Sequence, residues 1–390
     1  MPSRQTTKTH PDDEQEAAIG VNTSDDDGWI RREVLGTAVL GGGLLAGGAA
    51  TIPGLELSLP FQGPNSGFEA VTKAGEDLVV VGEDNGKRIL LGLHEDGSVR
   101  WHQRTARRQP ESSQLIQTLT GTGYGRVVAV DRETEPETDR AFTARYYDHG
   151  ERRWSLQVGP SRTTAITDLA TQDDSVFAVG TVATASAAGR LWHLPRLRAD
   201  DWETPTTLDA DSVSGVAMTS MGGLVVGARE DPVQQKWVGV LDADGELDSQ
   251  RTLDPGTFGP VAATTDGFVA AAGGSTISSG VRGLTRDGDT RWEASPNFVD
   301  VHDVLGFGNG GWAVLAEEGN DRTVVIAGDE DGNLSWRHQL DDAIVAESFA
   351  EGHPRTIVVV GTEHYENGYS GVAVAVRGGN DTWKTRYSDV

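Results

Sequence analysis

The stretch "LHEDGSVRWHQR", Leu93 to Arg104, contains the pattern that decides the fold. An apolar strand is followed by Asp-Gly, and a tryptophan stands four residues after the glycine. The same pattern returns as "LTRDGDTRWEA" (Leu284 to Ala294) and as "AGDEDGNLSWRHQL" (Ala327 to Leu340). Asp-Gly favours a tight turn between two strands, because glycine adopts positive φ without strain. The chain therefore repeats one β-hairpin whose second strand begins close to a tryptophan.

Seven copies of this unit fill the chain from about Phe68 to its end, with anchors 43 to 53 residues apart. The anchors are Gly97/Trp101, Gly150/Trp154, Trp202 (with Arg198 in place of glycine), Gly245/Ser249, Gly288/Trp292, Gly332/Trp336 and Gly379/Trp383. About twenty residues before each anchor lies a second signature, a short apolar run that usually ends in glycine. These runs end at Gly82, Asp131, Gly180, Gly227, Gly273, Ala316 and Gly361. Such a fixed period indicates a repeat architecture.

Each copy has room for four short strands bounded by Gly, Asp and Asn turns, and none shows helical periodicity. Four strands per unit of 40 to 50 residues is typical of a β-propeller blade. We therefore predict an all-β fold, a seven-bladed β-propeller of four-stranded blades over residues 68–390. A β-sandwich is the alternative, but it predicts no common tryptophan register. How the ring closes is left open by the sequence.

The recurring tryptophan is explained if its ring lies over the neighbouring blade and buries apolar area there. This pattern resembles the tryptophan-docking motif of quinoprotein-like propellers, which include pyrroloquinoline-quinone dehydrogenases and the outer-membrane assembly factor BamB. "LDADGELDS" and "AGDEDGNLSW" match it best, with Asp242 and Asp329 in the motif's Asp position. The resemblance covers about 320 residues but is specific only to the repeat. It implies a docking role for Trp101, Trp154, Trp202, Trp292, Trp336 and Trp383.

Composition excludes several classes of function. The 390 residues include no cysteine, so disulfides, zinc–thiolate sites and Cys nucleophiles are absent. A net charge of −26 argues against a nucleic-acid partner, which needs a basic surface. Of the 33 basic residues 28 are Arg, and methionine is scarce. This acidic, lysine-poor composition resembles that of haloarchaeal proteins, whose carboxylates are screened by molar salt. An ordinary acidic secreted protein is the alternative.

The amino-terminal region predicts export. Residues 1–28 are polar and acidic and read as a disordered leader. In residues 29–53, Arg31 and Arg32 precede an uncharged run from Val34 to Ile52 that contains six glycines. This resembles a twin-arginine signal, although the usual Ser before and Lys after the pair are missing. We expect an extracellular or cell-surface protein, joined to the membrane only if this segment stays uncleaved, with residues 54–67 as a linker.

The sequence offers no catalytic motif. Quinoprotein dehydrogenases of the resembled family have eight blades and a calcium-bound quinone, and no position here carries over their quinone ligands. The nine His residues form no His-x-His or His-Glu-x-x-His pair. We therefore predict a non-catalytic binding or assembly-scaffold propeller at the cell surface, with a protein partner or a small solute. A secreted hydrolase or a quinoprotein-type oxidoreductase that uses the channel mouth is the alternative.

The mouth of the central channel is the candidate ligand site, because innermost strands line it. Alignment back from the apolar runs places a polar ring at Glu69, Gln117, Asp168, Ser214, Gly259, Asp303 and Glu347. Its carboxylates, Glu69, Asp168, Asp303 and Glu347, predict a site for a cation or for a cationic or polyhydroxylated solute. Solvated strand ends are the alternative interpretation. Asp168 and Asp303 are not expected to be part of the core.

Calcium is the one cofactor considered. Asp242, Asp244 and Asp248 alternate around a glycine turn as carboxylates do in calcium loops, but the stretch is shorter than a full loop and also fits a plain turn. No other cofactor is expected. Asn333 and Asn380 begin the sequons "NLS" and "NDT" in equivalent turns, where glycosylation would need exposure.

Overall fold

The computed structural model describes residues 30–32, 66–84, 87–104, 115–123, 125–133, 141–158, 164–182, 188–197, 202–230, 233–274, 277–318, 322–352, 356–365 and 368–387. The predicted leader (1–28), nearly all of the predicted signal (29–53) and most of the linker (54–67) lie outside these ranges. Within them no helix is long and apolar enough to cross a membrane.

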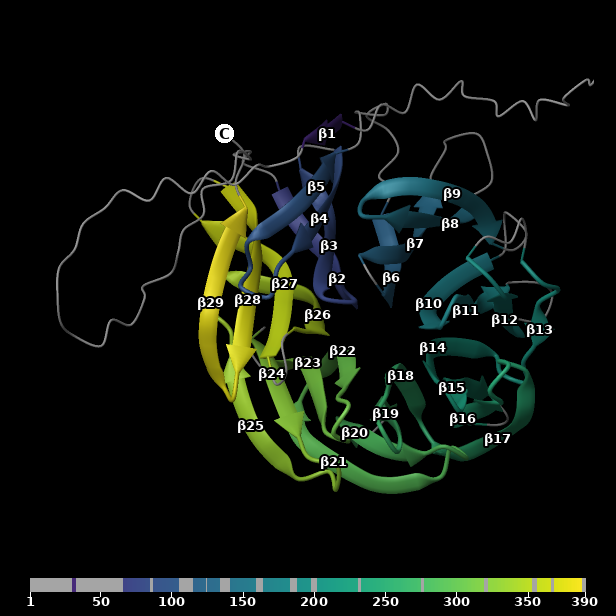
Figure 1. Ribbon diagram of the computed structural model, residues 1–390. Helices are drawn as coiled ribbons and strands as arrows, with labels where there is room; N and C mark the ends of the chain where they lie inside the picture. Colours follow the sequence, from purple (N-terminus) through teal and green to yellow (C-terminus); the bar gives the residue numbers. More distant parts are fainter. Residues whose placement is uncertain are drawn as a thin grey trace, which may run out of the picture.

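Seven antiparallel sheets stand around one axis, and each is built from consecutive strands (Figure 1). The prediction of a seven-bladed all-β propeller is confirmed. Blade 1 comprises β2 (Ser66–Ala74), β3 (Asp77–Asp84), β4 (Lys87–Leu93) and β5 (Val99–Arg104), and blade 2 comprises β6 (Leu115–Gly123), β7 (Arg126–Glu133), β8 (Ala141–Asp148) and β9 (Glu151–Val158). Blade 3 comprises β10 (Thr164–Gln172), β11 (Ser175–Val182), β12 (Ala188–Leu194) and β13 (Thr206–Thr207). Blade 4 comprises β14 (Ser212–Thr219), β15 (Gly222–Glu230), β16 (Gln234–Leu241) and β17 (Leu247–Pro255).

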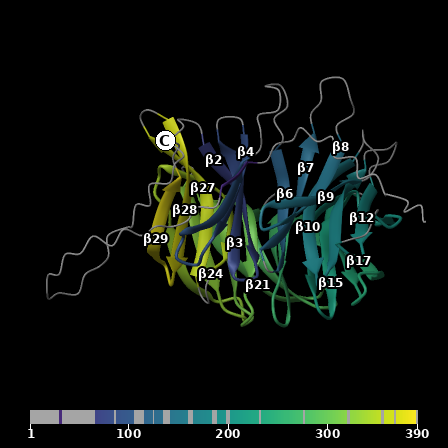
Figure 2. The same ribbon diagram turned by 45° about the horizontal axis from the view of Figure 1, so that its top comes forward.

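Blades 5 to 7 complete the ring. Blade 5 comprises β18 (Thr257–Ala263), β19 (Gly267–Gly274), β20 (Ile277–Thr285) and β21 (Thr290–Phe298). Blade 6 comprises β22 (Asp300–Gly306), β23 (Trp312–Glu318), β24 (Arg322–Gly328) and β25 (Leu334–Gln339). Blade 7 comprises β26 (Ile344–Glu351), β27 (Thr356–Tyr365), β28 (Gly368–Arg377) and β29 (Asn380–Tyr387). The first strand of each blade lies innermost and runs between the two faces of the ring (Figure 2). Blade 1 carries a fifth strand, β1 (Ile30–Arg32), which pairs antiparallel with β5.

The core lies between blades and not within them. In β3 the run Val79–Val81 is fully buried, because both faces of the strand are covered. Val79 and Val81 pack with Val127 of blade 2, whereas Val80 packs with Val358 of blade 7. The apolar run in each copy of the repeat is therefore the second strand of a blade, held between two neighbours.

The docking tryptophans cover the turn glycine of the next blade. A Cβ at Gly150 would lie 2.6 Å from the ring of Trp101, and one at Gly332 would lie 2.7 Å from the ring of Trp292. Trp292 also donates its Nε1–H to the carbonyl of Glu330 in the same turn, at 2.9 Å. The turn glycine thus serves twice, since it adopts positive φ and leaves room for the ring. Trp383 packs in the same way against Gly97, whereas Trp336 lies against Gly379 at ordinary contact distance.

Two units depart from this arrangement. Trp202 precedes the short outer strand β13 and packs against the core between blades 2 and 3, so it does not occupy the predicted equivalent position. In blade 4, where Ser249 replaces tryptophan, Arg251 reaches the next turn and donates to the carbonyl of Asp287 at 2.7 Å and to Asp289 at 2.8 Å. A cation here takes over part of the role of the indole N–H.

In the part of the chain that the structure describes, no sheet contains strands from both ends of the propeller, and side chains close the ring between blade 7 and blade 1. Trp383 donates to the carbonyl of Glu95 at 3.1 Å. Tyr387 is buried, donates its hydroxyl to the Gly97 carbonyl at 3.2 Å and meets Phe68 edge to face at 4.8 Å. The last strand of the described chain therefore holds the first blade through aromatic contacts.

Candidate functional site

The central channel opens into a cavity of about 610 Å³ that receives side chains from all seven blades. This volume is typical of small-molecule sites. The four carboxylates of the predicted ring all lie on its wall. Its polar lining consists of Glu69, Thr72, Lys73, Thr118, Thr120, Thr167, Asp168, Ser214, His302, Asp303, Glu347, Ser348 and Glu351. The structure brings the predicted residues together, and their binding of a ligand stays a prediction.

Every innermost strand carries a β-bulge near its start, which the sequence alignment did not anticipate. The pairing skips one residue in blades 1, 3, 6 and 7, namely Glu69, Thr167, His302 and Glu347. Asp168 and Asp303 follow the bulge, one residue later than their supposed equivalents. The predicted ring therefore mixed two positions, the bulge residue itself and the residue that follows it.

The glycine that ends each apolar run marks this bulge. A Cβ at Gly82 would lie 2.2 Å from the Gly67 carbonyl oxygen, and one at Gly180 would lie 2.0 Å from that of Ala165. Both glycines pair with the residue just before the bulge. The bent inner strand approaches its neighbour so closely that only a hydrogen fits at these two positions.

Asp168 uses its carboxylate to join three blades. Its Oδ2 accepts the backbone N–H of Val216 in blade 4 at 2.9 Å, and its Oδ1 accepts the hydroxyl of Thr118 in blade 2 at 3.4 Å. The N–H of Leu169 also donates to Oδ1, at 2.8 Å. Asp168 is therefore a structural link between blades, although it is only half-buried and does not belong to the core.

Asp303 repeats this arrangement between blades 6 and 7. It accepts backbone N–H groups of Val304 and Phe349, and the hydroxyl of Ser348 at 3.3 Å. Ser348 in turn accepts the N–H of Val71 in blade 1, at 3.4 Å. We call Asp168, Asp303 and Ser348 the inter-blade clasps. Each of the three directly follows a bulge.

Burial changes the acidity of both clasp carboxyls. Desolvation raises the pKa of Asp168 to about 7, although hydrogen bonds from Val216 and Leu169 oppose the shift and the charge of Asp303 adds a smaller increase. Desolvation likewise raises the pKa of Asp303 to about 6. The two groups thus change charge between pH 5 and 8, whereas an ordinary Asp does so near pH 4.

The remaining acidic residues of the channel differ from the clasps in exposure and in their partners. Glu347 is exposed and Glu351 is half-buried, and neither has a hydrogen-bond or ion-pair partner within the described part of the chain. Glu69 lies within the electrostatic reach of Arg88. His302 faces Glu317 at 3.8 Å, and Lys73 donates to the carbonyl of Gly352 at 3.1 Å. Sequence reasoning missed Glu351, which follows Glu347 by four residues on one strand.

The candidate calcium loop is an exposed turn. Asp242 accepts the N–H groups of Asp244 and Glu246 with one oxygen, at 2.9 Å each. Asp329 does the same in the equivalent turn of blade 6. Among the residues that the structure describes, no group of three or more His, Asp or Glu residues is arranged to hold a metal. Calcium at Asp242, Asp244 and Asp248 stays a prediction; Asn333 and Asn380 are both exposed.

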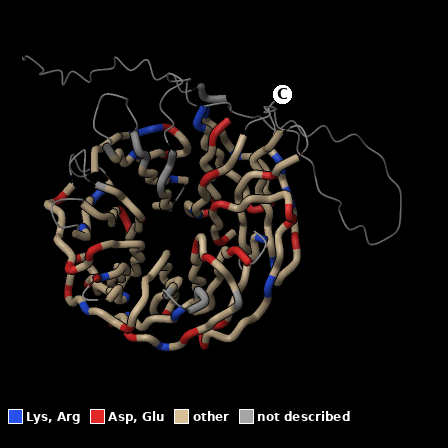
Figure 3. The backbone as a smooth tube through the Cα atoms, turned by 180° about the vertical axis from the view of Figure 1, so that it is seen from behind, with Lys and Arg blue, Asp and Glu red and all other residues tan. Residues whose placement is uncertain are grey.

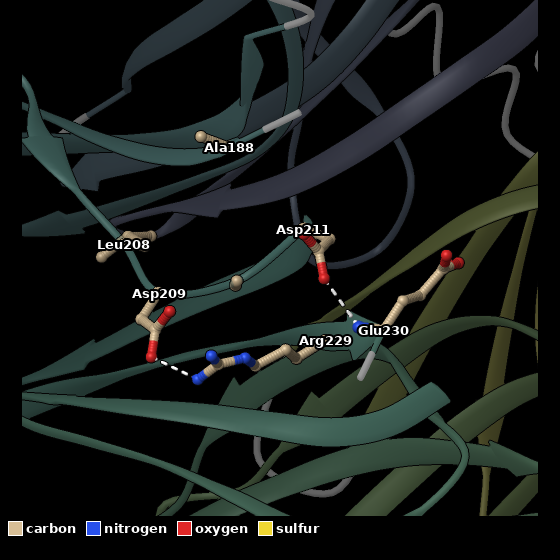
Figure 4. A pocket seen from close by; sticks show the side chains of 7 residues that line it. Ala188, Leu208, Asp209, Asp211, Arg229 and Glu230 are labelled. Atoms are coloured by element: carbon tan, nitrogen blue, oxygen red, sulfur yellow. Dashed lines mark hydrogen bonds and ion pairs between the residues drawn. The ribbon is translucent and has the colours of Figure 1, made fainter. Parts of the chain in front are cut away.

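Two surface hollows, one smaller and one larger than the channel cavity, are the other candidate sites. One, of about 280 Å³, lies between blades 3 and 4 (Figure 4), where Arg229 pairs with Asp209 and Asp211 accepts the N–H of Glu230 at 2.6 Å. The other, of about 760 Å³, lies beside the first turns of blade 1, where Arg100 pairs with Asp77. In both hollows an ion pair already engages charged side chains of the wall, and only one or two blades contribute residues.

Comparison with known proteins identifies the fold and goes no further. No family model matches the chain, and no curated protein matches its sequence. Among solved structures, a lectin from Burkholderia pseudomallei matches over 82% of this chain and 100% of its own, with a TM-score of 0.58 and 11% identity. Puromycin hydrolase matches over 85% of this chain, with a TM-score of 0.56 and 14% identity, but this chain spans only 57% of it. Hydrazine synthase of Kuenenia stuttgartiensis matches over 85% and 99%, with a TM-score of 0.53 and 10% identity. These likenesses show a β-propeller fold.

Proposed function

We propose that this protein is an exported, cell-surface binding propeller without catalytic activity, and that it takes a small solute in the central channel. The observation that carries the proposal is the 610 Å³ polar cavity to which every blade contributes. A ring of repeats has only one place where all units can act on a single small ligand. The quinoprotein-like resemblance and a halophilic origin belong to the same proposal.

Binding is favoured over catalysis by the way the channel hydroxyls are used. Thr167 donates to the carbonyl of Val213 at 2.9 Å, and Ser214 to that of Val226 at 3.3 Å. A nucleophilic Ser needs a nearby base to accept its proton, and these protons go to the wall instead. The similar lectin consists wholly of such a propeller, whereas the hydrolase has a large part without counterpart here.

A channel-filling variant tests the binding site. Ser214→Tyr would put a ring into the cavity from a bulge position, and Ser335→Tyr, exposed on outer strand β25, is the matched control. We expect a panel of cationic and polyhydroxylated solutes to contain a compound that raises the melting temperature of the parent and of Ser335→Tyr but not of Ser214→Tyr. Equal shifts in all three proteins, or none in the parent, would contradict a channel site.

Export is tested separately. Replacing Arg31 and Arg32 with Lys should retain the protein in the cytoplasm, because a twin-arginine translocase reads guanidinium geometry as well as charge. Cell fractionation of the native host, with Arg4→Lys as the control, measures this. Normal secretion of the double-Lys variant would remove the twin-arginine proposal and leave the channel proposal intact.

A further inference from the structure

We propose that the ligand of the channel is a linear organic polycation, a compound of the polyamine class, that lies along the channel axis. This inference rests on the proposed solute-binding function and names its ligand class. It follows from three features of the wall: the direction of its hydrogen bonds, the axial placement of its carboxylates, and its charge.

The wall presents acceptors to the cavity, because most of its donors are used within the protein. Five of the six lining hydroxyl side chains donate to protein oxygens. Thr120 must donate to Thr171, since Thr171 gives its own proton to the Gly121 carbonyl at 2.7 Å. Lys73 is directed to the carbonyl of Gly352. A hydroxyl that has given its proton to the wall keeps its lone pairs, so the ligand must supply N–H or O–H groups.

Two carboxylates stand one above the other on the same strand. Glu347 and Glu351 of β26 both line the cavity and are four residues apart along the strand, so they stand at different depths, about 13 Å apart. Glu69 of the neighbouring blade stands at the level of Glu347, because both are bulge residues. Positive groups would therefore be attracted at two depths of the channel, as a chain with an amine at each end requires.

The charge of the wall separates this ligand from the others. Five lining carboxyl groups face one Lys and one His, so an anion would be repelled. A bare metal ion needs several oxygens at one point, and within the described part of the chain no group of three acidic or His side chains provides them. A neutral polyol would satisfy the acceptors but leave Glu347 and Glu351 without a counter-charge. Protonated amines satisfy both requirements at once.

Isothermal titration with spermidine, at one fixed salt concentration, tests the inference. We expect saturable binding to the parent, weakened about tenfold for each carboxylate removed in Glu347→Gln/Glu351→Gln, which corresponds to about 1.4 kcal/mol each. Asp174→Asn/Asp266→Asn, two exposed carboxylates outside the channel, removes the same charge and should bind as the parent does. Equal weakening by both pairs would mean that spermidine senses only the net charge, and would overturn the inference.

Parallel titrations with the neutral polyol maltotriose and with calcium test separately whether the channel binds a solute and whether that solute is a polycation. If maltotriose binds the parent but not Ser214→Tyr while spermidine does not bind, the channel is a binding site and the polycation assignment is wrong. The same pattern with calcium would lead to the same conclusion. If no probe binds in a way that Ser214→Tyr abolishes, the proposed function and this inference both fail.

Discussion

The outer rim and the channel wall join the same seven blades by different chemistry. At the rim a tryptophan covers the turn glycine of the next blade, as Trp292 covers Gly332. At the channel wall a carboxylate or hydroxyl that follows a bulge accepts an N–H of the next blade, as Asp168 does from Val216. The rim contact buries apolar area and requires no exact hydrogen-bond geometry, whereas the clasp buries an acid and depends on it. Acidic residues, red in Figure 3, occur around the whole ring. The comparison predicts that the two regions respond to different perturbations.

The largest effect should come from the rim contact that closes the ring. Trp383→Ala removes packing on Gly97 and the bond to Glu95, and should cost about 3 kcal/mol of unfolding free energy, the lower end for loss of a large aromatic side chain. Urea unfolding in molar salt measures it. Trp336→Ala is the control, because it opens a similar contact between blades 6 and 7, which are also joined through the chain. A loss at Trp383 no larger than at Trp336 would show that closure does not depend on this ring.

Removing one clasp should lower the free energy of unfolding somewhat less than removing Trp383. Asp168→Ala leaves the N–H groups of Val216 and Leu169 without their acceptor and should cost about 2 kcal/mol. Asp168→Asn keeps an acceptor oxygen and should cost clearly less. Asp174→Ala, in an exposed turn of the same blade, is the control and should change stability by no more than about 0.5 kcal/mol. If Asp168→Ala behaves like the control, the clasp contributes nothing to blade association.

The clasps should also give stability a pH dependence that the rim lacks. The folded pKa values of Asp168 and Asp303, about 7 and about 6, lie above the unfolded value near 3.8. Their contribution is therefore complete below pH 4 and is lost as pH rises through 6 to 7, by about 1 to 2 kcal/mol once water in the channel is considered. Melting temperatures should fall from pH 5 to 8, less steeply in Asp168→Asn/Asp303→Asn. Parallel pH profiles for the parent and the double variant would rule out the clasps as the source.

The smallest effect belongs to the blade that lacks a docking tryptophan. Arg251 makes exposed contacts to Asp287 and Asp289, so Arg251→Met should cost only about 0.5 kcal/mol and less at high salt. Arg291→Met, exposed on β21, is the control for the loss of a positive charge. Chemical denaturation at low and molar salt would check this. A salt-independent loss as large as that of a tryptophan would mean that the arginine packs as tightly as the indole does.

The sequence predicted the turn and tryptophan contacts of the rim but not the exact positions of the channel residues, and the reason is physical. The Asp-Gly turn and the Trp that follows are local patterns, so their period alone determined the number of blades. Positions in the channel depend on register, and the sequence alignment placed Asp168 and Asp303, which follow the bulge, in one ring with the bulge residues Glu69 and Glu347. The signal for the bulge was present in the glycine that ends each apolar run, as at Gly180.

Some features had no local signature at all. Trp202 has the predicted residue type but precedes an outer strand of two residues, which its spacing could not reveal. The aromatic closure between Tyr387 and Phe68 joins the two ends of the propeller, and only the folded ring brings them together. Such contacts follow from the number of blades and cannot be read from any one of them.

The central claim is that the channel acids divide into structural clasps, Asp168 and Asp303, and ligand groups, Glu347 and Glu351. Measuring melting temperature and spermidine affinity together on the two paired variants tests it directly. Glu347→Gln/Glu351→Gln should lose about 100-fold in affinity and keep the melting behaviour of the parent. Asp168→Asn/Asp303→Asn should keep the affinity within about threefold and alter only the pH dependence of melting. If instead the Asp pair abolishes binding while the Glu pair leaves it unchanged, the division is wrong.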